Sequence, residues 1–212
     1  QTSASRPDVE LRMHQGLLEN PGLTADLVVD AASNGGCICV IANTVGSAQK
    51  LYRELLNRVD RNECELVLFH ARFPAWRRAE IEKRVLDLFD KRSTLRPGDE
   101  ERTIRPNRAI LVATQVIEQS LDVDFDEMFT EIAPIDLMLQ RIGRMHRHVR
   151  PLRPTGPIPR LHVLLPDSPG NGFGRTSVVY HPFILLKTLG VLSKMDRILL
   201  PADIRRLVEL VY

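Results

Sequence analysis

With 212 residues and a formal net charge of +2, the chain has room for the core of one α/β domain, and its overall charge alone does not indicate a nucleic-acid-binding protein. Its three cysteines contain no Cys-x-x-Cys pair, which argues against a disulfide framework or a zinc site. Because no apolar run approaches the roughly 20 residues that cross a bilayer, we expect a soluble protein of the reducing cytoplasm with no membrane partner.

Apolar runs alternate with amphipathic stretches along the chain, a pattern typical of a parallel sheet with helices on its faces. Strands are predicted over residues 37–42, 65–69, 109–113, 128–132 and 161–165. Helices are predicted over residues 48–59, 74–89, 134–144, 182–194 and 201–211. The charged, proline-bearing segment 91–108 is predicted to be a surface loop without an assignable role, and residues 150–160 a proline-rich excursion.

Polar residues follow the third predicted strand in the stretch 113–126 (ATQVIEQSLDVDFD). In open parallel sheets, ligands bind beyond the carboxyl ends of the strands. The Thr114 hydroxyl can hold a phosphate, and the Asp122 carboxylate can accept hydrogen bonds from sugar hydroxyls. Strand-end capping by solvated acids is the alternative that these residues alone leave open.

A metal site is not predicted. The alternating aspartates of this stretch resemble the start of a calcium-binding EF-hand loop, but Glu127 stands where that loop needs glycine, and Ala133 where it needs glutamate. His146 and His148 have no adjacent carboxylate or cysteine partner that would complete a metal site.

A second polar segment, residues 140–147 (QRIGRMHR), ends the helix that begins at Pro134. Arg144 and Arg147 are three residues apart, so on a helical turn both would project to one side and could converge on one anion. Gly143 directly precedes Arg144 and has no side chain, so it would allow a ligand or a neighbouring chain to approach closely. The alternative is that these cations only stabilise the helix C-terminus.

Taken together, the two segments match a known pattern. A threonine at a strand end with Leu-Asp about eight residues on, followed by Q-x-x-G-R-x-x-R, resembles motifs V and VI of superfamily-2 helicases. More narrowly, TQVIEQSLDVDFD followed by APIDLMLQRIGRMHRH is similar to the CRISPR-associated helicase/nuclease of type I systems, which unwinds and degrades invading DNA after recruitment by a surveillance complex. Residues 41–52 resemble motif IV, residues 69–82 its neighbouring motif, and residues 200–212 the helices beyond the second lobe.

This resemblance implies an α/β fold: a RecA-like parallel sheet flanked by helices, with a small helical C-terminal appendage. Residues 1–36 would be a lead-in from a first lobe, residues 37–166 the second RecA-like lobe, and residues 167–212 a linker with accessory helices. The chain contains neither G-x-x-x-x-G-K-[ST] nor a DExH/DExD box, so we expect it to be inactive alone and to act as an ATP-dependent helicase only within a longer protein.

By the same resemblance, one set of residues serves ATP with Mg²⁺, which the first lobe would mainly bind. Arg144 and Arg147 would stabilise charge on the γ-phosphoryl group. Gln140 would contact the γ-phosphate or couple it to the first lobe, and Asp122 would contact the ribose or the interlobe network. Gly143 and Ser120 complete this expected nucleotide set.

A second set would contact the backbone of single-stranded DNA: Thr44, Thr114, Gln115, His70 and Arg72. Thr44 follows the first predicted strand, where helix N–H groups favour an anion, but a plain N-cap is an equally good interpretation. His70 could instead be a structural hydrogen-bonded group and Arg72 a surface cation. Further expected partners are the first lobe and nuclease domain of the same protein and a CRISPR surveillance complex.

Two other functions remain open at this point. One is a non-catalytic DNA-binding or docking module, in which the arginines no longer meet a nucleotide. The other is a lobe of a different superfamily-2 motor acting on RNA or chromatin. A preference for RNA or DNA strands would separate the latter from a DNA translocase.

Overall fold

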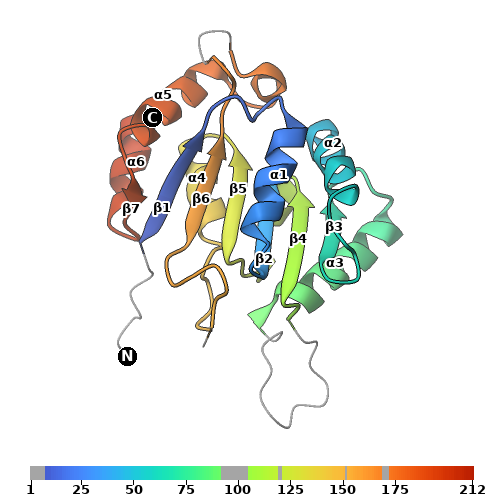
Figure 1. Ribbon diagram of the computed structural model, residues 1–212. Helices are drawn as coiled ribbons and strands as arrows, with labels where there is room; N and C mark the ends of the chain where they lie inside the picture. Colours follow the sequence, from blue (N-terminus) through green and yellow to red (C-terminus); the bar gives the residue numbers. More distant parts are fainter. Residues whose placement is uncertain (1–7, 92–104, 119–120, 151, 169–171) are drawn as a thin grey trace.

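The computed structural model describes residues 8–91, 105–118, 121–150, 152–168 and 172–212 (Figure 1). The strands are β1 (Val9–His14), β2 (Gly36–Ile41), β3 (Glu65–Phe69), β4 (Arg108–Ala113), β5 (Glu127–Glu131), β6 (Arg160–Leu164) and β7 (Arg197–Ile198). Among the described residues, these strands form one sheet in the order β3-β4-β2-β5-β6-β1-β7. Neighbouring strands are parallel except β1 and β7. The predicted α/β class is confirmed, and each predicted strand is present with its ends within one residue.

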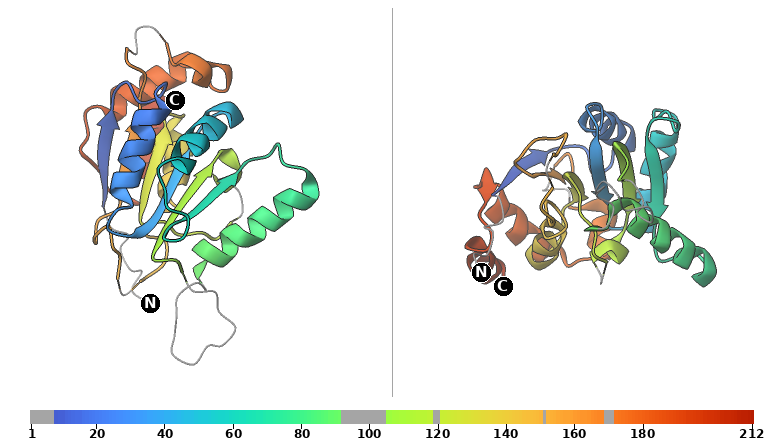
Figure 2. Two further views of the ribbon diagram at one scale, coloured as in Figure 1. Left: turned by 45° about the vertical axis from the view of Figure 1, so that its right-hand side comes forward. Right: turned by 90° about the horizontal axis from the view of Figure 1, so that it is seen from below.

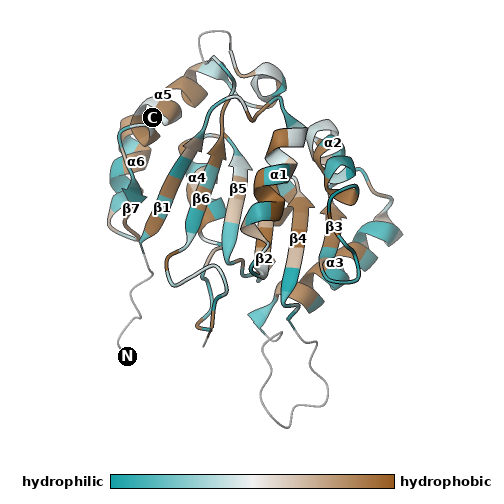
Figure 3. Cartoon of the chain, in the orientation of Figure 1, coloured by the Kyte–Doolittle hydropathy of each residue, from teal (hydrophilic) through white to brown (hydrophobic). Residues whose placement is uncertain are grey.

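Helices cover both faces of this sheet (Figure 2). They are α1 (Pro21–Ala31), α2 (Val45–Leu56), α3 (Ala75–Phe89), α4 (Ile135–Ile142), α5 (Pro182–Leu192) and α6 (Asp203–Val211), with short 3-10 helices η2 (Gln115–Glu118) and η4 (Gly174–Val178). Side chains of β2 alternate between two cores: Ile38 and Val40 pack with α1 and α2, and Cys39 packs with α3 and α4. Because both faces are buried, the strand is apolar throughout. Figure 3 shows the same for most of the neighbouring β4, which is coloured as hydrophobic beyond its polar start.

Both ends of the chain contribute to the same sheet. The strand β1 pairs with β6, and α1 packs against α2, so residues 9–31 of the expected lead-in add a strand and a helix to the domain. The predicted C-terminal helices are present, and their side chains Leu185 in α5 and Leu207 and Val211 in α6 are fully buried. The boundaries 1–36, 37–166 and 167–212 remain a prediction. No described helix is long and apolar enough to cross a membrane.

The end of α4 corrects one prediction. The helix ends at Ile142, so Arg144 and Arg147 lie in the turn that follows it and not on a helical turn. The backbone of this turn bonds to the segment before β5: Phe125 N–H donates to the Arg144 carbonyl at 2.9 Å, and His146 N–H donates to the Phe125 carbonyl at 3.1 Å. These long-range bonds compete with helix continuation, and His146 adopts a φ of +43° beside them.

The segments predicted as a surface loop and an excursion carry buried charges, which is a second correction. Residues 92–104 lie outside the described part, but Arg105 pairs with Asp126 at 2.9 Å, and Arg108 begins β4. From the proline-rich segment, the buried side chains of Arg150 and Arg153 bind Asp124. Asp124 and Asp126, two of the three aspartates that suggested a calcium loop, therefore neutralise arginines at the amino-terminal edge of the sheet.

Candidate functional site

A row of polar residues follows three adjacent strands at their carboxyl ends. Ile41 at the end of β2 and Phe69 at the end of β3 both pair in register with Ala113 at the end of β4. Because these ends are level, the residues that follow them share one edge of the sheet. This strand-end row consists of Thr44, His70 and Thr114, together with Gln115 and Arg72.

Thr44 is the N-cap of α2. Its side-chain oxygen accepts a hydrogen bond from the Ser47 backbone N–H at 3.1 Å, and its hydroxyl lies 2.9 Å from the Ser47 hydroxyl. Thr44 thus acts as an N-cap in the structure. The side chain is only partly buried, so it also remains open to an anion at this helix end.

Two residues of the row are covered in this conformation. His70 and Thr114 are each only 3% exposed. The His70 ring stacks on Phe73 with centroids 4.1 Å apart, and burial lowers its pKa, which favours the neutral form. The stacking favours the structural alternative for His70 in this conformation, and Arg72 is the exposed residue of the two. The contacts of both residues with DNA remain a prediction.

Gln115 is also used inside the protein. Its amide N–H₂ donates to the Asn43 carbonyl at 2.8 Å and lies 3.1 Å from the Tyr180 hydroxyl. The start of η2 is thereby tied to the residue that precedes Thr44. Gln115 thus fixes the relative positions of two parts of the strand-end row.

The sequence analysis missed a buried arginine on the inward face of α4. Arg141 is 0% exposed, and its nearest carboxylate is that of Glu118, at 2.7 Å. The other inward positions of α4 are apolar, namely Ile135, Met138 and Ile142. An arginine at this inward spacing, with an acid in the preceding segment, was the available signal for a buried ion pair.

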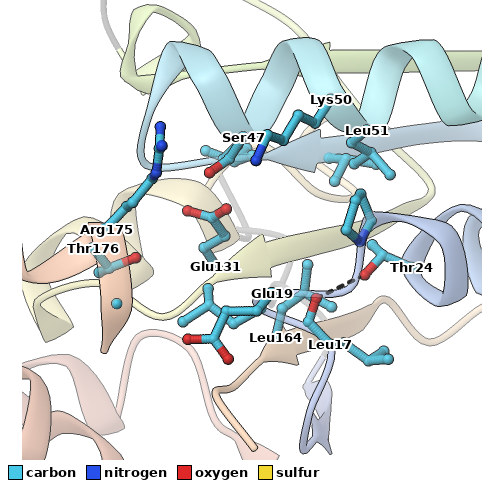
Figure 4. Close-up of a pocket in the computed structure, with 16 residues that line it drawn as sticks. Leu17, Glu19, Thr24, Ser47, Lys50, Leu51, Glu131, Leu164, Arg175 and Thr176 are labelled. Carbon is cyan, nitrogen blue, oxygen red and sulfur yellow. Dashed lines mark hydrogen bonds between the residues drawn. The ribbon is translucent and has the colours of Figure 1, made fainter. Parts of the chain in front are cut away.

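Glu131 at the end of β5 is the unusual acid of this region. Its carboxylate accepts from the Asn43 backbone N–H at 2.6 Å and lies in a cavity of about 250 Å³ between α1 and α2 (Figure 4). Lys50 and Arg175 line the same cavity together with apolar side chains such as Leu51. Burial raises the pKa of Glu131 to about 7, so near neutral pH the carboxyl is only partly ionised.

The raised pKa of Glu131 predicts a pH-dependent stability. The pKa of this carboxyl is about 7 in the folded chain, against an ordinary value of 4.5, so between these values the folded chain binds a proton that the unfolded chain releases. The stability that the folded chain gains from this bound proton is therefore fully present below the pKa of the unfolded state and is lost as the pH rises through the pKa of the folded state. Raising the pH from about 5 to about 6.5 should therefore lower the free energy of unfolding by about 2 kcal/mol.

Urea unfolding of the 212-residue chain and of its Glu131→Gln variant at both pH values measures this effect. The amide still accepts from Asn43 but does not titrate, so the stability difference between the two proteins should change with pH. A constant difference across the range would show that Glu131 does not hold the proton.

The expected nucleotide residues lie on another part of the molecule, where the turn after α4 meets the segment after η2. The Arg144 guanidinium donates to the backbone carbonyls of Leu121 and Glu118, the latter at 2.9 Å. The Arg147 Nε lies 2.7 Å from an Asp122 carboxylate oxygen, and the His148 ring lies 3.1 Å from the same oxygen.

These contacts bring three of the six expected nucleotide residues together: Arg144, Arg147 and Asp122. The side chains of Arg147 and Asp122 keep 34% and 49% of their surface exposed. An ion pair this exposed is worth at most about 1 kcal/mol, so an incoming phosphate could displace the carboxylate at little cost. Gln140 is exposed on α4 and Gly143 caps that helix, while Ser120 lies outside the described residues.

Comparisons with known proteins identify relatives of this arrangement. The family model described as "CRISPR-associated nuclease/helicase Cas3, C-terminal" matches residues 34–150. The chain is 43% identical over 162 residues to the CRISPR-associated endonuclease/helicase Cas3 of Escherichia coli K12, which covers 76% of the chain and 17% of that relative.

Solved structures agree with the sequence comparison. The crystal structure of T. fusca Cas3-ATP matches 98% of the chain with a TM-score of 0.84 and 33% identity, and the chain covers 24% of it. A chain from a structure described as "CRISPR RNA-guided surveillance complex, pre-nicking" matches with a TM-score of 0.77 and 29% identity; the chain covers 25% of it. The chain thus spans between a sixth and a quarter of the length of these relatives.

Proposed function

We propose a function from one premise: this chain belongs to the Cas3 nuclease/helicase family and matches its C-terminal region. The chain would be the second motor lobe of an ATP-dependent single-stranded-DNA translocase in CRISPR defence. In this role it supplies arginines to ATP held mainly by a first lobe, and it contacts the DNA backbone along the strand-end row. The full protein would act in the cytoplasm with its first lobe, its nuclease domain and a surveillance complex.

The observation that carries the nucleotide role is the pairing of Arg147 with Asp122 beside Arg144. Two guanidinium groups gather at one exposed location, held by weak or backbone contacts. Burial and the neighbouring Arg147 lower the pKa of Arg144, although an arginine stays charged at neutral pH. The triphosphate and ribose of ATP suit this location, because the arginines offer bidentate donors and Asp122 an acceptor for ribose hydroxyls, while a first lobe would mainly hold the accompanying Mg²⁺.

The T. fusca relative, described as Cas3-ATP, supports this cofactor, and the relative from the surveillance-complex structure supports such a partner. ATP turnover by the full-length protein with single-stranded DNA, with RNA and without nucleic acid tests the proposed function. Stimulation by DNA alone is expected. Equal or greater stimulation by RNA would favour a different superfamily-2 motor.

The second candidate remains a non-catalytic DNA-docking module. One observation favours it: in this structure both arginines are already engaged within the chain, Arg144 by carbonyls and Arg147 by Asp122. In such a module these contacts would be permanent, and arginine substitutions would leave ATP turnover unchanged.

The DNA role of Thr44 can be separated from its N-cap role. In the full-length protein, Thr44→Ala should cost about 1 kcal/mol of stability, because the cap is lost. Thr44→Asp should keep the cap but place a carboxylate against the DNA phosphates, so affinity for single-stranded DNA should fall about tenfold, equivalent to about 1.4 kcal/mol. Fluorescence anisotropy at one fixed salt concentration measures this affinity.

Asn20 provides the matched control for Thr44. It caps α1 in the same way, its side chain accepting from the Leu23 N–H at 3.1 Å. Asn20→Asp therefore adds a carboxylate at a neighbouring helix start and should leave DNA affinity nearly unchanged. If Thr44→Asp binds DNA as tightly as the parent, Thr44 is only a cap.

A further inference from the structure

The Arg141 guanidinium connects four separate parts of the chain. Its Nε donates to Glu118 at 2.7 Å, and one terminal nitrogen donates to the Thr130 hydroxyl at 2.6 Å and to the Glu131 carbonyl at 3.0 Å. The other terminal nitrogen donates to the Asn43 side-chain oxygen at 3.1 Å and lies 3.4 Å from the Tyr180 hydroxyl. The five donors of an arginine are thus all directed at partners.

One end of this network reaches the strand-end row. Asn43 immediately precedes Thr44, and its side-chain nitrogen donates to the Ile132 carbonyl at 2.7 Å while its carbonyl accepts from Gln115. Gln115 in turn follows Thr114 directly. Movement of either threonine toward a phosphate would therefore pull on groups that Arg141 or its partners hold.

The other end reaches the nucleotide residues. Glu118, which accepts from Arg141 through its carboxylate, also accepts from Arg144 through its backbone carbonyl at 2.9 Å. The Arg141 and Glu118 side chains are 0% and 7% exposed. A charged pair buried in this way holds its geometry, because separating it leaves an uncompensated charge away from water.

We propose that Arg141 and Glu118 are positioning residues that link contact with DNA at the strand-end row to the placement of Arg144. Neither side chain touches ATP or DNA; the pair holds η2 and the turn after α4 in a fixed relation to Asn43. This inference rests on the proposed function, because it assigns a coupling role within the same motor.

The test measures ATP turnover of the full-length protein with and without single-stranded DNA. The double variant Arg141→Met with Glu118→Gln removes both charges while keeping similar volumes, so no buried charge is left unpaired. The ratio of DNA-stimulated to unstimulated turnover should fall about tenfold, within the usual range of coupling between sites. Glu118→Gln alone keeps an acceptor for the Arg141 Nε and should lose less, and it decides the test if the double variant does not fold.

Arg58→Met is the matched control, because Arg58 also bridges two helices through Asp26 and Glu54 but lies away from both sites. Its stimulation ratio should equal that of the parent. The inference is overturned if the folded Arg141 and Glu118 variants keep the parent's ratio, or if stimulated and unstimulated turnover fall by the same factor. A parent that DNA does not stimulate would instead refute the proposed function itself.

Discussion

Replacing Arg147 with alanine in the full-length protein is expected to lower DNA-stimulated ATP turnover at least about a hundredfold. The guanidinium is held 2.7 Å from Asp122 in an exposed pair, beside Arg144. When ATP binds, the negative charge that develops on its γ-phosphoryl group would attract Arg147 more strongly than the single carboxylate of Asp122 does. Because that stabilisation arises mainly in the transition state, kcat should fall more than the affinity for ATP.

Arg205→Ala is the matched control for this measurement. Arg205 also forms an exposed ion pair, with Glu209 in α6, and within the described part of the chain no hydrogen bond or ion pair joins its side chain to Arg144, Arg147 or Asp122. Its kcat should equal that of the parent. If Arg147→Ala keeps the parent's kcat, Arg147 has a structural role, and the docking-module alternative gains.

Replacing Asp124 with alanine is expected to destabilise the 212-residue chain by about 3–5 kcal/mol, the usual cost of removing one partner of a buried ion pair. The Asp124 side chain is 0% exposed and binds Arg150 and Arg153, whose side chains are 2% and 6% exposed. It also accepts from the Arg147 backbone N–H at 2.9 Å. The substitution would leave buried guanidinium groups without this carboxylate and would loosen the turn that carries Arg147.

Urea unfolding measures this loss, and Asp26→Ala provides the control. Asp26 also pairs with an arginine, Arg58, but is 60% exposed, so its removal should have a far smaller effect. If Asp124→Ala unfolds at the same urea concentration as the parent, the buried cluster does not stabilise the turn.

The central strands were predictable because burial on both faces leaves a simple signature. Residues 37–42 are apolar at every position, and no solvent-facing residue obscures the run. The strand β1 was missed although Val9–His14 alternates apolar and polar residues, which is the period of a half-buried strand. Its pairing with β6, more than a hundred residues later, is a tertiary contact that local sequence does not specify.

The site was predictable as a set of residues but not as a geometry. The sequence identified Arg147 and Asp122 separately, and only the structure pairs them. The helical placement of Arg144 was wrong because its carbonyl accepts from distant Phe125. Arg141 was missed because an arginine next to a glutamine in a polar segment is ordinarily solvated, whereas here acceptors from several elements converge on it.

We propose that this chain completes a nucleotide site whose other half would lie in the first lobe. The most direct test is steady-state ATP hydrolysis with single-stranded DNA by the 212-residue chain and by the full-length protein, measured side by side. We expect turnover by the full-length protein and none above the buffer rate by the chain alone. Turnover by the chain alone at a rate comparable to that of the full-length protein would contradict this proposal, because the described arginines would then act on a nucleotide held by this chain itself.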